Sequence, residues 1–278
     1  MKLKTSFLIL PAALLLFKFS AAAEDFDARL GAISGSVEVL AAPEADVWSD
    51  AEEGMPLSAG DKVRSGADSS AEIALDDGGV IRLGENSTVK VSSLGRSSAS
   101  FFLDMGSLVA KIQGLLKKKL ERLEVRTPAA VAAVRGTEFC VEHDQAENET
   151  TAGVFDEGKL SVSAIDADGK PVAEGLVEQG NEVSLRAGAR EVRPAGMRRL
   201  LRRRAHVLAM RTRLTALRKT WKRMPPEKRM ELRERFTKLR AARAERRGKA
   251  ADQNSMRPPR PLSPQRPLPA RRNTRNKR

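Results

Sequence analysis

The side chains best suited to catalysis or metal binding are one cysteine and two histidines, Cys140, His143 and His206. Neither histidine has a carboxylate or thiol neighbour at the spacing that metal ligands need. Cys140 lies between Glu138 and Glu142, whose negative charges would raise its pKa and weaken it as a nucleophile. The sequence also contains no Ser-His-Asp set and no phosphate-binding loop. We therefore expect a protein that is not an enzyme and that uses neither a cofactor nor a metal.

Cys140 is the single cysteine of the chain, so an intrachain disulfide is impossible. Residues 137–142 have the composition of a β-strand. If Thr137 and Phe139 face the core, Cys140 shares the opposite face with the two glutamates. Two interpretations remain open. Cys140 is either a small, half-buried residue or the site of an interchain disulfide, which would appear as a reducible dimer.

The remaining chemistry is ionic. Residues 24–193 carry 18 Lys and Arg against 31 Asp and Glu, a net charge of −13, whereas residues 194–278 carry 29 against 5, a net charge of +24. Clustered cations of this kind bind anionic surfaces or nucleic acid. The candidate anion contacts are Arg198, Arg199, Arg202, Arg203, Arg204, Arg211, Arg218 and Lys222.

The first 23 residues have the pattern of a signal peptide. Lys2 and Lys4 precede an apolar run at residues 7–17, and Ala21-Ala22-Ala23 forms a small-residue cleavage site. The apolar run is shorter than the ~20 residues that cross a bilayer, which disfavours an uncleaved anchor. We predict cleavage near Ala23, a periplasmic or secreted location, and no membrane span in the mature chain.

Residues 24–193 read as a mainly β domain. Short apolar runs with a period of two are separated by turn residues every eight to twelve positions, which is typical of an antiparallel sandwich, barrel, roll or small solenoid. Gly60, Gly78, Gly136 and Gly158 are expected at turns or close approaches. Asp61 and Asp77 are expected to accept hydrogen bonds from turn backbone. Thr127-Pro128 and Gly136-Thr137 mark chain reversals that flank a core strand, and Phe139 belongs to the core.

The order of these motifs resembles the FecR-domain family over residues of about 35–185. The motifs are G-D-K-V-R-S at 60–65, L-D-D-G at 75–78, T-P at 127–128, V-R-G-T-E-F at 134–139 and E-G at 157–158. Ser65 departs from the threonine usual at its position. The resemblance implies a periplasmic all-β module of short strands in a roll or solenoid-like arrangement.

Well-known members of that family relay signals from an outer-membrane transporter, across the inner membrane, to a sigma factor. This relay needs a cytoplasmic segment and a membrane span, and we expect neither here. What the resemblance carries over is therefore a protein-interaction or ligand-sensing module in the envelope.

From about residue 194 the apolar period changes from two to that of a helix. Apolar residues recur at alternating steps of three and four, in a heptad-like seam broken at Met224-Pro225-Pro226. We predict a basic helical hairpin at 194–248 with coiled-coil-like packing, followed by a disordered, Pro- and Arg-rich tail at 249–278. Residues 221–236 also weakly resemble the Trp and Pro-Glu repeats of some exported helical proteins.

The leading hypothesis is an exported, non-enzymatic envelope protein. Its β domain would bind a protein or glycan, and its basic C-terminal region would bind lipopolysaccharide, anionic lipid or peptidoglycan. One alternative is nucleic-acid binding through the basic region, which ranks lower because aromatic residues for base stacking are scarce there. Another is assembly through attraction between the acidic body and the basic region, within one chain or between neighbours.

Overall fold

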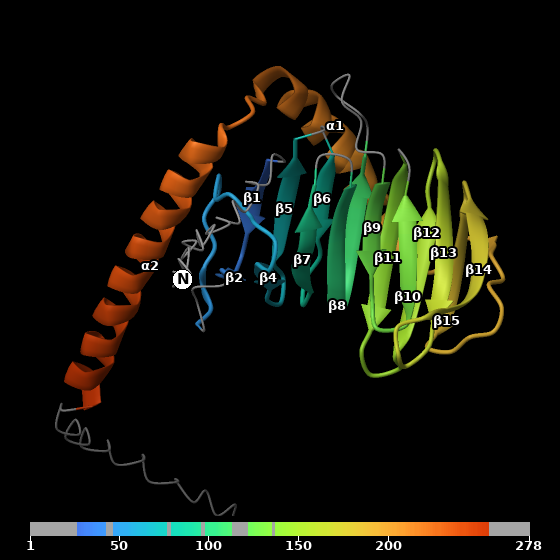
Figure 1. Cartoon of the computed structure of the whole chain (residues 1–278), viewed down its shortest axis with the longest axis horizontal. Helices are drawn as coiled ribbons and strands as arrows, with labels where there is room; N and C mark the ends of the chain where they lie inside the picture. The colour runs from blue at the N-terminus through green and yellow to red at the C-terminus, as the bar shows by residue number, and fades with distance from the viewer. Residues whose placement is uncertain are drawn as a thin grey trace, which may run out of the picture. The chain divides into compact units, whose positions relative to one another are not determined.

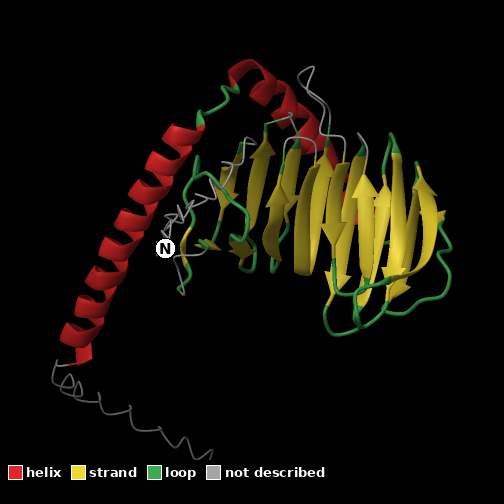
Figure 2. Ribbon diagram, in the orientation of Figure 1, coloured by secondary structure: helices red, strands yellow, loops and turns green. Residues whose placement is uncertain are grey.

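A computed structural model describes residues 27–42, 47–76, 79–95, 98–112, 122–134 and 137–255 (Figure 1). The described chain is dominated by short strands, followed by two helices, which confirms the predicted mainly β class (Figure 2). The predicted signal peptide at 1–23 lies outside the described residues. No helix among the described residues has the length and apolar character needed to cross a membrane.

The strands form two sheets that share one long strand, β8 (Ser98–Lys111). In the first sheet, here called sheet A, the order is β1 (Ala28–Ser34), β5 (Ser70–Leu75), β6 (Val80–Leu83), β8, β11 (Glu138–Asp144), β12 (Glu149–Val154), β15 (Asn181–Arg186) and β16 (Ala195–Gly196).

In the second, sheet B, the order is β3 (Ser49–Asp50), β2 (Val37–Leu40), β4 (Lys62–Ser65), β7 (Thr88–Leu94), β8, β9 (Arg122–Arg126), β10 (Ala130–Val134), β13 (Lys159–Ile165) and β14 (Pro171–Glu178). The pairs of named strands are antiparallel apart from β8 with β9.

β8 links the sheets because its two halves pair with strands of different sheets, and Gly106 between the halves has a φ of +88°. Its first half pairs with β7 and β9 of sheet B, and its second half pairs with β6 and β11 of sheet A. From β9 onward, strands that follow one another in sequence alternate in pairs between the sheets: β9 and β10 in sheet B, β11 and β12 in sheet A, β13 and β14 in sheet B, and β15 and β16 in sheet A. This topology agrees with the sandwich and solenoid-like options that the strand pattern favours.

One hydrophobic cluster fills the space between the sheets. Every second residue of the central strands points into it, as in β7, where Val89 and Val91 are fully buried while Lys90 and Ser92 are exposed. Phe101 and Phe139 are the largest side chains buried there. The assignment of Phe139 to the core is therefore confirmed.

A short 3₁₀ turn (Leu200–Arg203) leads into α1 (Arg204–Thr220), and α2 (Pro226–Ser255) follows after the predicted break at the prolines. The apolar seam of α1 packs on sheet A, whereas coiled-coil-like packing would pair such a seam with another helix. The heptad-like spacing gives the apolar face correctly but does not specify what covers that face.

Residues 1–236 form one compact unit and residues 237–278 another. In the second unit the helix continues to Ser255, seven residues past the predicted boundary at 248. Residues 256–278, which hold most of the predicted tail, lie outside the described residues.

Candidate functional site

The outer faces of the two sheets differ in what covers them. On sheet A, Leu200, Val207, Met210 and Leu214 of the helical segment pack against a second hydrophobic cluster built from four strands or their ends, namely Val80, Val109, Cys140 and Phe155. Cys140 is fully buried there, and burial raises the pKa of its thiol well above the ordinary value. The face assignment of residues 137–142 is thus correct, and Cys140 is more buried than either interpretation assumed.

Ion pairs hold α1 in place around this apolar contact. Glu138 is fully buried and receives hydrogen bonds from Lys111 of β8 and from Arg211 of α1, whose Nε lies 2.7 Å from its Oε1. Burial alone would raise the pKa of Glu138, but these two cations outweigh it and lower the pKa below the ordinary value. Arg211 also reaches Asp156 at 2.6 Å.

Most of the candidate anion contacts belong to the same network. Glu142 pairs with Arg202 and Arg203 at 2.5 and 2.6 Å, and the other pairs join Arg199 to Glu149, Arg204 to Asp156 and Arg211 to Glu138. Glu182 accepts hydrogen bonds from the backbone N–H groups of Arg199 and Leu200, where the 3₁₀ turn begins.

The other three candidate anion contacts, Arg198, Arg218 and Lys222, are not among these ion pairs. Arg198 is exposed without an ion pair to any described residue, Arg218 lies in α1, and Lys222 accepts a hydrogen bond from Arg29 through its backbone carbonyl. The attraction between acidic body and basic region therefore operates within one chain. It engages five side chains that we had assigned to an external anion.

A second set of contacts holds the start of α2 against the turn that contains Asp61, just before β4. Asp61 is fully buried and accepts hydrogen bonds from the backbone N–H groups of Ala42 and Ser58, as predicted for a turn aspartate. It also accepts two from Arg233 of α2, at 2.6 and 3.1 Å. At the end of α1, Trp221 donates to Asp76 and stacks under Arg29, whose guanidinium carbon lies 4.0 Å from the ring centre.

The remaining motif residues are structural. The buried Thr127 hydroxyl accepts hydrogen bonds from the N–H groups of Ala129 and Ala130 and closes the turn that contains Pro128. Thr137 donates to the carbonyl of Glu157, beside Gly158. The φ of Gly158 is +96°, and a Cβ there would lie 2.3 Å from the Thr137 side chain, so glycine is required. Gly60, with φ +94°, makes a similar close approach. Asp77, Gly78 and Gly136 lie outside the described residues.

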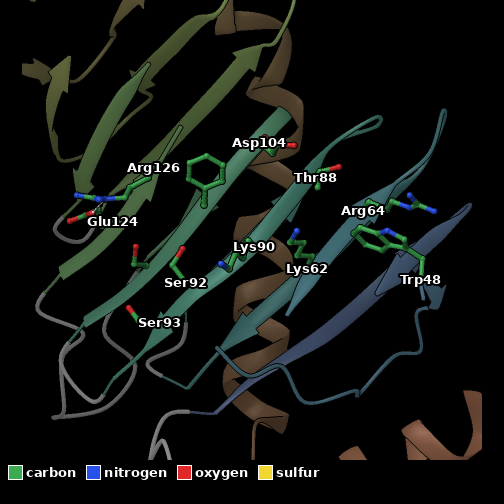
Figure 3. Close-up of a pocket in the computed structure, with 12 residues that line it drawn as sticks. Trp48, Lys62, Arg64, Thr88, Lys90, Ser92, Ser93, Asp104, Glu124 and Arg126 are labelled. Atoms are coloured by element: carbon green, nitrogen blue, oxygen red, sulfur yellow. Dashed lines mark hydrogen bonds and ion pairs between the residues drawn. The ribbon is translucent and has the colours of Figure 1, made fainter. Parts of the chain in front are cut away.

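The outer face of sheet B carries an open groove of about 810 Å³, which sequence reasoning missed (Figure 3). It is lined by residues of four neighbouring strands, β4, β7, β8 and β9, and by Trp48, which precedes β3. Its side chains comprise two aromatic rings, four cations, two carboxylates and several hydroxyls: Trp48, Lys62, Arg64, Thr88, Lys90, Ser92, Ser93, Ser100, Phe102, Asp104, Glu124 and Arg126. Such a mixture suits a binding surface.

Strand register places four of these residues in one row across the groove. Lys62 of β4 is opposite Lys90 of β7, Lys90 is opposite Phe102 of β8, and Phe102 is opposite Arg126 of β9. Arg126 pairs with Glu124 on its own strand. The row therefore presents a partly exposed phenyl ring between cations. The sequence signal was the alternation Lys62-x-Arg64 and Thr88-x-Lys90-x-Ser92, but the row depends on register between strands.

Arg64 connects the end of the groove to Trp48. Its guanidinium carbon lies 4.2 Å from the centre of the indole ring, and its Nε donates to Glu38 at 2.7 Å. Stacking and ion pairing together restrict both side chains. Trp48 is thus held as a fixed wall of the groove.

His143 is buried and His206 is half-buried. Burial lowers the pKa of His143, whose Nδ1 lies 3.0 Å from the hydroxyl of Thr150, and burial also lowers the pKa of His206. Within the described ranges, no group of three or more His, Cys, Asp and Glu side chains has the arrangement of a metal site.

Comparison with known proteins finds a match to one family model. Residues 61–159, roughly a third of the chain, match the family model described as FecR protein. No curated protein matches. Two crystal structures of a candidate anti-sigma factor from Parabacteroides distasonis, at 2.50 and 1.65 Å resolution, are similar over 50% of this chain, each with 15% identity and a TM-score of 0.40. The similarity spans 61% of the length of that solved chain. Asp61, Thr127, Thr137 and Gly158 lie inside the residues that match the FecR protein model.

Proposed function

We propose that the protein is an exported, non-enzymatic interaction module of the cell envelope, and that its FecR domain recognises a partner in the groove of sheet B. The observation that carries the proposal is the asymmetry of the two sheets. α1 covers the outer face of sheet A, whereas the groove on sheet B presents fixed aromatic, hydroxyl and charged groups to solvent. The partner is an envelope protein or glycan, in keeping with the sensing role typical of FecR domains.

Export is proposed from the leader, with cleavage near Ala23 and a periplasmic or secreted mature chain. N-terminal sequencing of the protein recovered from the periplasmic fraction tests this step, and the mature chain should begin near Glu24. Recovery of the intact leader on cytoplasmic protein would contradict it.

We also propose that the far C-terminal region fastens the protein to an anionic envelope surface, either lipopolysaccharide, lipid or peptidoglycan. Residues 237–278 alone carry 14 Lys and Arg against 2 Asp and Glu. Each Lys or Arg near an anionic membrane surface contributes about 1 kcal/mol at moderate salt. The ion pairs of residues 199–233 with the body leave this later stretch as the better anchor.

Site-specific photo-crosslinking in the native envelope tests the role of the groove. A crosslinking residue at Ser92, on the exposed face of β7, should form adducts with an envelope component. The control position is Leu208, which is 47% exposed on the outer side of α1. Adducts from Leu208 but none from Ser92 would remove the groove as the recognition surface.

Truncation after Phe236 tests the anchor, because it keeps the first compact unit and its ion pairs while removing the second unit. The shortened protein should lose sedimentation with envelope fractions and with anionic vesicles. Equal partitioning of full-length and shortened protein would count against anchoring.

A further inference from the structure

We propose that the groove of sheet B binds an acidic polysaccharide, with an anionic group of the glycan seated between Lys62 and Lys90. This inference rests on the recognition role proposed for the groove, and it specifies the chemical class of the ligand. The two lysines are opposite one another on adjacent strands, and both are exposed on the groove side (Figure 3).

The lysine pair stands out because no described residue forms an ion pair with either ammonium group. Like charges directly opposite on neighbouring strands destabilise a sheet. Among the described residues neither Lys62 nor Lys90 forms an ion pair, whereas Arg64 pairs with Glu38 and Arg126 pairs with Glu124. An anion between the two ammonium groups would relieve this repulsion.

The position of the pair strengthens the argument. The groove is lined by four cations and two carboxylates, and Glu38 beside it pairs with Arg64, which leaves a net charge of +1, although residues 24–193 as a whole have a net charge of −13. The positive charge of the groove is therefore a local feature, opposite in sign to the charge of the domain as a whole. It attracts anions to one place and disfavours them elsewhere on the domain.

The other groups of the groove match a sugar. Phe102 lies next to Lys90 in the row and offers an apolar ring on which the C–H face of a sugar can pack. Ser92, Ser93 and Ser100 both donate and accept hydrogen bonds, and Asp104 and Glu124 accept them, as sugar hydroxyls require.

A peptide fits less well. β4, β7, β8 and β9 each have hydrogen-bonded neighbours on both sides, so the groove has no free strand edge to which a peptide could add by backbone pairing. Recognition must come from side chains. A glycan that carries both carboxylates and hydroxyls, such as a uronic acid oligomer, meets this condition.

The test uses full-length protein and tetragalacturonate, with neutral dextran oligomers, a sulfated dextran oligomer and tetraglutamate as comparison probes. Acylation of each lysine is followed by mass spectrometry. Tetragalacturonate should protect Lys62 and Lys90, while Lys159, which pairs with Glu178 away from the groove, and Lys170 stay unprotected. Protection by the sulfated oligomer as well would identify a general anionic glycan site, which also supports the proposal.

The matched variants are the double substitutions K62Q/K90Q and K159Q/K170Q, which remove the same charge. The first should weaken tetragalacturonate binding at least about tenfold and leave the fold intact, because it relieves a repulsion. The second should bind as the wild type does. Binding that survives K62Q/K90Q, or protection by tetraglutamate alone, would overturn the glycan assignment. If Ser92 still crosslinks to an envelope component, the recognition role of the groove stands even though this inference fails.

Discussion

The guanidinium of Arg233 and the carboxylate of Asp61 form a bidentate ion pair that joins α2 to the first acid of the FecR match. Asp61 is fully buried, and the side chain of Arg233 is 17% exposed. The pair is therefore one of the best-shielded contacts between the body and the basic region. It joins the start of α2 to the β domain, within the compact unit formed by residues 1–236.

Arg233→Met should lower the free energy of unfolding by about 3 kcal/mol, because it leaves a buried carboxylate without its cation. Arg235→Met, which removes an exposed arginine two residues later on the same helix, should change it by less than about 0.5 kcal/mol. Urea denaturation followed by circular dichroism measures both. If both variants lose the same small amount of unfolding free energy, the ion pair between Arg233 and Asp61 is not shielded from solvent.

Glu138→Gln should destabilise the protein at neutral pH by about 3 kcal/mol, since Lys111 and Arg211 lose their shared buried anion. The pKa of Glu138 in the folded protein is below its ordinary value of 4.5. Its contribution is thus complete above that value and is lost as pH falls through the folded pKa. The difference between wild type and variant should shrink below pH 4.5 in denaturation measured across pH.

Glu147→Gln serves as the control for that experiment. Glu147 pairs with Arg186 on the surface, where both side chains are more than 60% exposed. Such pairs contribute about 0 to 1 kcal/mol. The free-energy difference between wild type and Glu147→Gln should therefore stay small at every pH. If it changes with pH as the difference for Glu138→Gln does, the buried network has no special role.

Met210→Asp should detach α1 from sheet A, because it places an unpaired charge in a fully buried position. Cys140 then becomes accessible, and its reaction with a thiol reagent under native conditions should be at least about tenfold faster, which corresponds to ~1.4 kcal/mol lost from docking. Leu208→Asp, on the exposed side of the helix, should leave the rate unchanged. Fast labelling of the wild type would contradict the covered face.

Gly158→Ala should be more costly than Gly169→Ala. Both glycines have positive φ, at +96° and +77°, which costs an alanine about 1 kcal/mol or more. A Cβ at 158 also meets Thr137, whereas a Cβ at 169 meets nothing within 4 Å. Thermal unfolding of the two variants separates backbone strain from the clash. Equal shifts would show that Thr137 can move aside.

Local patterns in the sequence predicted the local structure well. The period of two in residues 137–142 gave the correct faces for Phe139 and Cys140, and the prolines at 225 and 226 marked the break between helices. What covers the Cys140 face could not be predicted in this way. The patch under α1 brings together Val80, Val109 and Phe155, which come from distant parts of the chain.

The groove escaped sequence reasoning for a similar reason. Lys62, Lys90, Phe102 and Arg126 each look like an ordinary exposed residue of a half-buried strand. Their alignment depends on the register of three strand pairs, one of which contains two bulge-like shifts and one of which is parallel. The charge split was visible in the sequence, but its partition between internal ion pairs and external contacts depends on the tertiary structure.

Hydroxyl-radical footprinting tests the central claim that the groove of sheet B is the occupied face. Trp48 and Phe102 line the groove, and Trp221 is a matched ring outside it, at the end of α1. In intact envelopes, oxidation of Trp48 and Phe102 should fall several-fold relative to purified protein, because bound ligand shields both rings, while oxidation of Trp221 stays the same. Equal oxidation of Trp48 and Phe102 in the two settings would contradict the claim.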